Sequence, residues 1–183
     1  MESYGKEFET HNGDNILVGN SAAATNNHLD LLEYLKTLDL NGRKLILPLS
    51  YAGGQDYVIK VVTRYRNFFG DSVVALTDFM PYDEYKKSIL SCGTAFFFME
   101  RQQAMGNISA ALKYGCKVFL SERNPVFAYY KKLGIKVFSV ENGDLSSDLT
   151  TQDVETNRKI LTSLHNREAF LRKLDSVYAA LCG

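Results

Sequence analysis

The chain has 183 residues, of which 45% are hydrophobic and 23% charged, a composition typical of one soluble globular domain with a substantial core. Lys plus Arg and Asp plus Glu both number 21, so the formal net charge is zero. This balance gives no electrostatic reason to expect binding to nucleic acid or to an anionic membrane. Residues 1–14 are polar and lack the apolar segment of a signal peptide, so they are interpreted as a leader or the remnant of an interdomain linker.

Three cysteines, Cys92, Cys116 and Cys182, are far apart and form neither a C-x-x-C pair nor a cluster with histidine. This pattern favours free thiols in a reducing compartment and predicts no metal site. No apolar run approaches the roughly 20 residues needed to span a bilayer. We therefore expect a cytoplasmic protein.

In the first half of the chain, short apolar segments alternate with amphipathic ones. Strands are predicted at residues 16–18, 44–47 and 72–76, and helices at 29–38, 56–68 and 82–91. Thr25 or Asn26 is the predicted cap of the first helix, and Pro81 marks the start of the third.

The second half continues the alternation. Strands are predicted at residues 94–98, 117–120 and 136–140, and helices at 102–114, 124–132, 151–164 and 167–180. The strongly apolar fourth strand is expected at the centre of the sheet, and Gly115 is expected to cap the helix after it. Together the elements predict an α/β fold, a Rossmann-like three-layer domain with a mostly parallel sheet of about six strands and C-terminal helices.

In such a fold, ligands gather beyond the carboxyl ends of the strands. The first strand is followed by Gly19, Asn20 and Ser21, and His28 lies in the first turn of the next helix. Backbone N–H groups of this turn, or the His28 ring, can donate to a phosphate. The turn is not G-x-G-x-x-G, and the second strand ends in Leu47-Pro48 without an acidic residue, which argues against an NAD site.

The fourth strand leads into the segment richest in polar side chains. Arg101 is suited to hold a diphosphate, although pairing with Glu100 or another surface carboxylate is the alternative. Neutral donors follow at Gln102, Gln103 and Asn107. Gly106 is expected to let the helix approach another backbone or a ligand closely.

Other loop residues give weaker signals. Tyr51 can stack on a base or close the pocket. Glu122 and Asn124 can hold sugar hydroxyls, with helix capping as the alternative for Asn124. No nucleophile–base pair, acidic metal cluster or phosphate loop is present, so the catalytic residues stay unknown. The residues alone indicate a binding domain more clearly than an enzyme.

Several short segments, in order over about residues 16–138, resemble the C-terminal domain of the bacterial 4-alpha-L-fucosyltransferases, the TDP-N-acetylfucosamine:lipid II N-acetylfucosaminyltransferases of enterobacterial common antigen synthesis. These segments are Ile16-Leu17-Val18-Gly19-Asn20-Ser21 with Asn26-x-His28, Pro48…Tyr51, Phe79…Asp83-x-Tyr85, Arg101-Gln102-Gln103-x-Met105-Gly106 and Asn124-Pro125. Ala22-Ala23-Ala24 departs from the more polar loop of the enterobacterial proteins.

The resemblance implies a GT-B glycosyltransferase of two Rossmann-like domains, in which residues 15–183 form the C-terminal domain that binds the nucleotide sugar. It implies an inverting transfer of 4-acetamido-4,6-dideoxygalactose from a TDP donor to a lipid-linked saccharide. The acceptor would bind through an N-terminal domain outside this chain, at the cytoplasmic face of the inner membrane. No metal or other cofactor is expected, with Arg101, helped by Asn20 and Ser21, neutralising the diphosphate and Gln102, Gln103 and Asn107 contacting the phosphates or the sugar.

Two other interpretations stay open at this stage. A non-catalytic Rossmann- or flavodoxin-like module that binds a small ligand or a protein is supported by the missing catalytic set. An NAD-dependent oxidoreductase is disfavoured by the missing glycine fingerprint.

Overall fold

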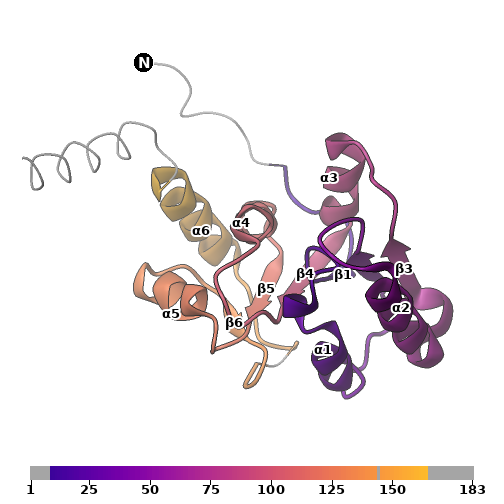
Figure 1. Ribbon diagram of the computed structural model, residues 1–183. Helices are drawn as coiled ribbons and strands as arrows, with labels where there is room; N and C mark the ends of the chain where they lie inside the picture. The colour runs from indigo at the N-terminus through magenta and orange to yellow at the C-terminus, as the bar shows by residue number, and fades with distance from the viewer. Residues whose placement is uncertain (1–8, 144, 165–183) are drawn as a thin grey trace, which may run out of the picture.

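A parallel six-stranded sheet organises the computed structural model, which describes residues 9–143 and 145–164 (Figure 1). The strand order is β3-β2-β1-β4-β5-β6, so β1 and β4 lie side by side in the middle. This order confirms the predicted Rossmann-like sheet and the central fourth strand. The strands are β1 (Asn15–Val18), β2 (Leu45–Pro48), β3 (Val73–Leu76), β4 (Cys92–Phe97), β5 (Lys117–Leu120) and β6 (Phe138–Ser139).

Helices cover both faces of the sheet, as right-handed crossovers require. They are α1 (His28–Leu35), α2 (Gln55–Phe69), α3 (Tyr82–Leu90), α4 (Met105–Lys113), α5 (Pro125–Lys132) and α6 (Thr151–Leu164), with short 3-10 turns η1 (Ala24–Asn26) and η2 (Gly70–Ser72). Ile16 of β1 packs in one core with α1 and α2, whereas Leu17 packs in a second core with α3, α4, α5 and α6. Neighbouring residues of a strand point to opposite faces, so β1 to β5 contribute to both cores.

On the face of the sheet that α1 and α2 cover, these helices do not extend over β5 and β6, and aromatic rings fill the core there. Phe96 stacks on Phe119 with ring centroids 4.7 Å apart, and Phe119 lies 5.3 Å from Phe138. Leu145 and Leu149, in the segment after β6, pack against this core. A loop therefore takes the place of a helix over β5 and β6.

Helix ends agree with the predictions where the capping chemistry is local. Gly115, at φ +82°, ends α4, and the N–H groups of Gly115 and Cys116 donate to the carbonyls of Leu112 and Ala111, the hydrogen bonds of a Schellman motif. The predicted caps of α1 are wrong, because Asn27, in the left-handed region, precedes α1 and caps it with no side-chain hydrogen bond.

The helix predicted at residues 102–114 begins at Met105 in the structure, three residues after its predicted start. Residues 98–104 form a loop, and Ala104 enters the helix from the left-handed region at φ +58°. The chain needs this loop to leave β4 and reach the face where α4 packs.

The described part of the predicted leader, residues 9–14, is bonded to the folded domain. The N–H groups of His11 and Asn12 donate to Tyr114 and Leu90, and Glu9 pairs with Lys86. Residues 1–8, the predicted helix 167–180 and Cys182 lie outside the described residues.

Cys92 and Cys116 are buried free thiols, as predicted. Among the described helices, none is long and apolar enough to cross a membrane.

Candidate functional site at the switch point of the sheet

The central strands β1 and β4 feed helices on opposite faces of the sheet, which opens a crevice beyond their carboxyl ends. The turn after β1 (residues 19–27) and the loop after β4 (residues 98–104) meet there. The side-chain amide of Asn27 donates to the Phe98 carbonyl at 3.0 Å, and the Thr25 hydroxyl donates to Gln103 Oε1 at 2.9 Å. The two segments richest in predicted site residues are therefore joined.

The turn after β1 requires its glycine. Gly19 has φ +71°, and a Cβ there would lie 2.8 Å from His28 Nε2 and 2.9 Å from Asn26 Oδ1. Asn20 and Ser21 follow, both almost fully buried. The Asn20 N–H donates to Asn26 Oδ1 at 3.1 Å.

His28 lies underneath this turn and is fully buried. Its Nδ1 shares a hydrogen bond of 3.1 Å with the Tyr57 hydroxyl, whereas its Nε2 has no hydrogen-bond partner among the described residues. Burial lowers the pKa of His28 to about 4, so the ring is neutral at pH 7. Donation from His28 to a phosphate stays a prediction.

Arg101 lies exposed in the middle of the loop after β4. Its Nε donates to Gln103 Oε1 at 2.9 Å and its Nη2 to Thr25 Oγ1 at 3.4 Å. The predicted alternative, pairing with Glu100, is wrong, because Glu100 pairs with Arg123 at 2.7 Å. Within residues 9–143 and 145–164, no carboxylate neutralises Arg101.

The N-terminus of α4 faces the same crevice. Ala104 precedes it, and no side chain caps the first turn, so the N–H groups of Met105, Gly106 and Asn107 form the positive end of the helix dipole. A Cβ at Gly106 would meet nothing within 4 Å. The predicted close approach to another backbone is therefore wrong, and approach of a ligand stays a prediction.

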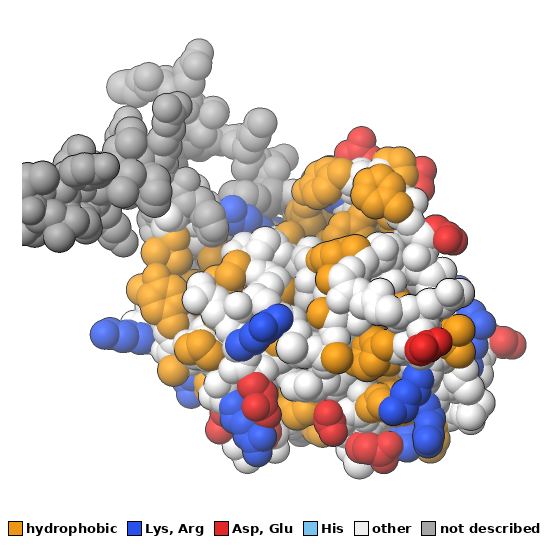
Figure 2. Space-filling model, in the orientation of Figure 1, with side chains coloured by type: hydrophobic (Ala, Val, Ile, Leu, Met, Phe, Trp, Pro, Cys, Tyr) orange, Lys and Arg blue, Asp and Glu red, His pale blue; other side chains and the backbone are white. Residues whose placement is uncertain are grey.

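A groove of about 530 Å³ runs from this crevice between α3 and α4. Its walls carry four tyrosines and two asparagines: Asn20, Tyr51, Tyr82, Tyr85, Asn107 and Tyr114. Figure 2 shows hydrophobic side chains gathered over the end of the molecule where α3 lies, and Tyr82 is 70% exposed there.

The polar atoms of the groove, apart from Lys86, are neutral and partly paired. Asn20 Nδ2 donates to the Tyr51 hydroxyl at 2.9 Å, but Asn20 Oδ1 has no partner among the described residues. The Tyr85 hydroxyl donates to Asn107 Oδ1 at 3.2 Å, and burial raises the pKa of Tyr85. Lys86 brings a cation, which is paired with Glu9.

Tyr51 also holds the loop after β2 against the turn after β1. Its carbonyl accepts the N–H of Ala22 at 2.8 Å. A Cβ at Gly53 would run into the Ala22 carbonyl oxygen. The site wall at Tyr51 therefore depends on the glycine at position 53, whereas a Cβ at Gly54 would meet nothing within 4 Å.

At the end of β5, the alternative roles of Asn124 are decided in favour of capping. Asn124 is fully buried, and its Oδ1 accepts the N–H of Val126 at 3.0 Å. Its Nδ2 donates to the carbonyls of Met99 and Arg101 at 3.0 and 3.1 Å. Asn124 therefore attaches the loop after β4 to α5.

Glu122 is exposed beside Asn124, and its Oε1 accepts a hydrogen bond of 3.0 Å from Asn142. This hydrogen bond holds the pKa of Glu122 below its ordinary value. Sequence reasoning missed Glu141, which accepts from the Ser121 hydroxyl at 2.6 Å and the Glu122 N–H at 3.0 Å. Nothing in the local sequence shows that residue 141 returns to the end of β5.

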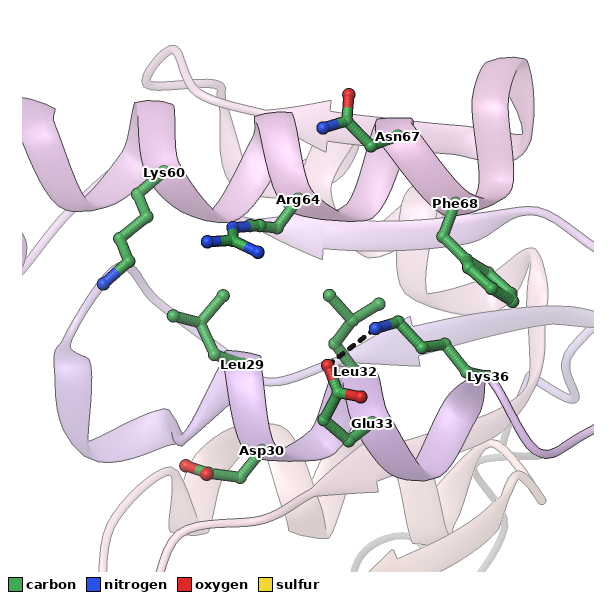
Figure 3. Close-up of a pocket in the computed structure, with 9 residues that line it drawn as sticks. All are labelled: Leu29, Asp30, Leu32, Glu33, Lys36, Lys60, Arg64, Asn67 and Phe68. Atoms are coloured by element: carbon green, nitrogen blue, oxygen red, sulfur yellow. Dashed lines mark hydrogen bonds and ion pairs between the residues drawn. The ribbon is translucent and has the colours of Figure 1, made fainter.

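A second hollow, of about 440 Å³, lies between α1 and α2 (Figure 3). Lys60, Arg64 and Phe68 point from α2 toward α1, where Lys36 and Glu33 form an ion pair of 2.7 Å. None of the predicted site residues lines this hollow. The candidate site is therefore the crevice at β1 and β4 with the groove between α3 and α4.

Among the described residues, no three His, Cys, Asp or Glu side chains gather as a metal site would require. Sequence reasoning also missed Asn26 as an organiser of the turn, since it considered this residue only as a helix cap.

Comparisons with known proteins agree with this arrangement. An uncharacterized protein of Escherichia coli (strain K12), YibG, is 26% identical over 116 residues, which covers 61% of this chain and 71% of YibG. The crystal structure of an alpha,alpha-trehalose-phosphate synthase (UDP-forming) from Burkholderia vietnamiensis superposes with a TM-score of 0.62 at 13% identity, over 93% of this chain. The chain spans 46% of the length of that structure, and at this identity the likeness shows the fold alone.

The family described as 4-alpha-L-fucosyltransferase, glycosyl transferase group 56, matches residues 3–173. This match covers most of the chain and agrees with the resemblance at the turn after β1 and the loop after β4. The chain belongs to this family of glycosyltransferases.

Proposed function

We propose that this chain is the donor-binding domain of an inverting glycosyltransferase and that it binds a TDP-sugar. The observation that carries the proposal is the meeting of Arg101, the uncapped N-terminus of α4 and the turn at Gly19 in one crevice. The family suggests a fucosyl-type sugar, and the resemblance narrows it to a 4-acetamido-4,6-dideoxygalactose-like group.

The diphosphate would lie between the two segments at the switch point. A helix N-terminus favours anions through its free N–H groups and its dipole. Arg101 has no carboxylate partner among the described residues and can reach a phosphate with its remaining N–H groups. These charges would stabilise the leaving diphosphate without a metal ion.

The nucleoside would lie in the groove between α3 and α4. Its tyrosine rings offer faces for stacking on a base. A base and a deoxyribose are neutral, and the described lining of the groove carries no charge except Lys86, which is paired with Glu9. The sugar would extend toward Glu122, whose carboxylate can accept hydroxyl groups.

The acceptor, a lipid-linked saccharide, would bind through a second domain, and transfer would take place at the cytoplasmic face of the inner membrane. The catalytic base would come from that domain. The assignment of the acceptor site and the catalytic base to a second domain is supported by the family resemblance and by the absence of a nucleophile–base pair among the described residues.

Calorimetric titration with TDP, UDP and GDP, each with magnesium and with EDTA, tests the proposal. We expect TDP to bind in EDTA and to shift amide signals of residues 19–28 and 101–107 in heteronuclear NMR spectra. The residues around Lys60 and Arg64 serve as an internal control, because they line the other hollow. Binding of none of the nucleotides, or shifts confined to the hollow between α1 and α2, would contradict the proposal.

A further inference from the structure

Asn26 is fully buried, and its side chain is devoted to the turn after β1. Its Oδ1 accepts the N–H of Asn20 at 3.1 Å, and its Nδ2 donates to Ser21 Oγ at 3.1 Å and to the Ala23 carbonyl at 3.2 Å. One side-chain amide thus bonds to three of the four residues 20–23.

A buried amide is costly unless its hydrogen bonds are made, and an apolar side chain would fill the same space without that cost. The three bonds of Asn26 fix a backbone N–H and a hydroxyl orientation, which apolar packing does not do. Its partner Asn20 donates from its side-chain Nδ2 to the Tyr51 hydroxyl, and Asn20 Oδ1 has no hydrogen-bond partner in the described part of the chain.

The back of the turn is also rigid beyond Asn26. Gly19 lies against both Asn26 and His28. His28 is held by the hydroxyl of Tyr57 at its ring and by the hydroxyl of Tyr65, which donates to its carbonyl at 2.7 Å. The turn therefore has a fixed support on the side away from the groove.

We infer that Asn26 is a positioning residue of the donor site, which holds Asn20 and Ser21 in the geometry that meets the ligand. This role rests on the proposed function. Asn26 itself is buried and does not line the groove.

The test compares N26A and N26D with N157A and N157D. Asn157 is a matched control, because it is 1% exposed and its side chain accepts the N–H of Lys136 at 2.7 Å and donates to the Lys136 carbonyl at 3.1 Å. It lies on α6 and lines neither hollow. TDP affinity is measured by calorimetry at a temperature where urea unfolding shows each variant to be folded.

We expect N26A to weaken TDP binding about tenfold and N157A to leave it within about twofold, although both lose stability. N26D should lie between N26A and the unaltered chain, because a carboxylate still accepts the N–H of Asn20 but cannot donate to Ser21 or Ala23. If N26A does not fold, the TDP affinity of N26D tests the inference in its place. Native affinity in both Asn26 variants, or an equal loss in N157A, overturns the inference.

Amide hydrogen exchange separates this inference from the proposed function. If the unaltered chain binds no TDP, the proposed function fails. The Asn20 amide should nevertheless exchange faster in N26A than in N157A, and unchanged exchange refutes the positioning role.

Discussion

Replacing Arg101 by alanine tests the electrostatics of the crevice most directly. A guanidinium has five N–H bonds, and the hydrogen bonds to Gln103 and Thr25 use two of them. The remaining three are enough for a two-point contact with a phosphate. Hydrogen bonds to a charged group contribute about 1.5–3 kcal/mol, which corresponds to a roughly ten- to 150-fold change in Kd.

Exposure of Arg101 places the expected loss at the lower end of this range, because solvent and salt screen exposed charges. Calorimetry with TDP at low and high salt should show weaker binding by R101A and a smaller dependence of its affinity on salt. R101K should recover part of the loss, since it keeps the charge but not the planar fork.

R64A is the matched control, because Arg64 is exposed on α2 and lines the other hollow. Equal affinity of R101A and the unaltered chain would refute the role of Arg101. Equal weakening by R64A would show that only overall charge matters.

Three further predictions concern stability, each checked by urea unfolding. G19A should lower the free energy of unfolding by about 2 kcal/mol, because its Cβ would meet His28 Nε2 at 2.8 Å and φ is +71°. In G42A the Cβ would meet nothing, so only the backbone strain of a positive φ remains, about 1 kcal/mol. Equal losses would refute the packing argument. N124A should lose about 2–3 kcal/mol, since it removes a helix cap and the donor to the buried Met99 carbonyl and the partly buried Arg101 carbonyl. A loss below about 0.5 kcal/mol would contradict this. The pKa of His28 is lowered from 6.5 to about 4, so on acidification the unfolded chain binds a proton before the folded chain does. Stability should therefore fall by roughly 3 kcal/mol between pH 6.5 and pH 4. H28Q should lack this part of the fall, and an identical acid profile in H28Q would refute the contribution of His28.

Much of the fold follows from local patterns. The strands of a parallel sheet are buried on both faces and appear as short apolar runs, which is why residues 117–120 are predicted with the observed bounds. Gly115 caps its helix as expected, and Asn124 takes the capping role that the sequence offered as an alternative to sugar binding, because both use hydrogen bonds within a few residues.

The errors arise where distant residues decide the conformation. Residues 102–104 have helical neighbours, but Thr25 and Arg101 hold Gln103 in the loop. The pairing of Glu100 with Arg123 depends on the adjacency of β4 and β5, which a pair of neighbouring charges does not reveal. Tyr85 and Tyr114 resemble ordinary helix-packing residues until α3 and α4 are placed side by side as the walls of one groove.

The distribution of charge in the crevice bears on what this domain does in transfer. When a glycosyl group leaves its donor, the diphosphate gains a negative charge, and catalysis requires groups that bind this charge more strongly in the transition state than in the donor. On the described part of this chain, that role would fall to Arg101 and the N-terminus of α4. Contacts that hold donor and product alike lower Kd without accelerating the reaction. Alone, the chain should therefore bind TDP more tightly than a TDP-sugar, and equal affinity for the two would show that the selective charges lie in the proposed partner domain instead.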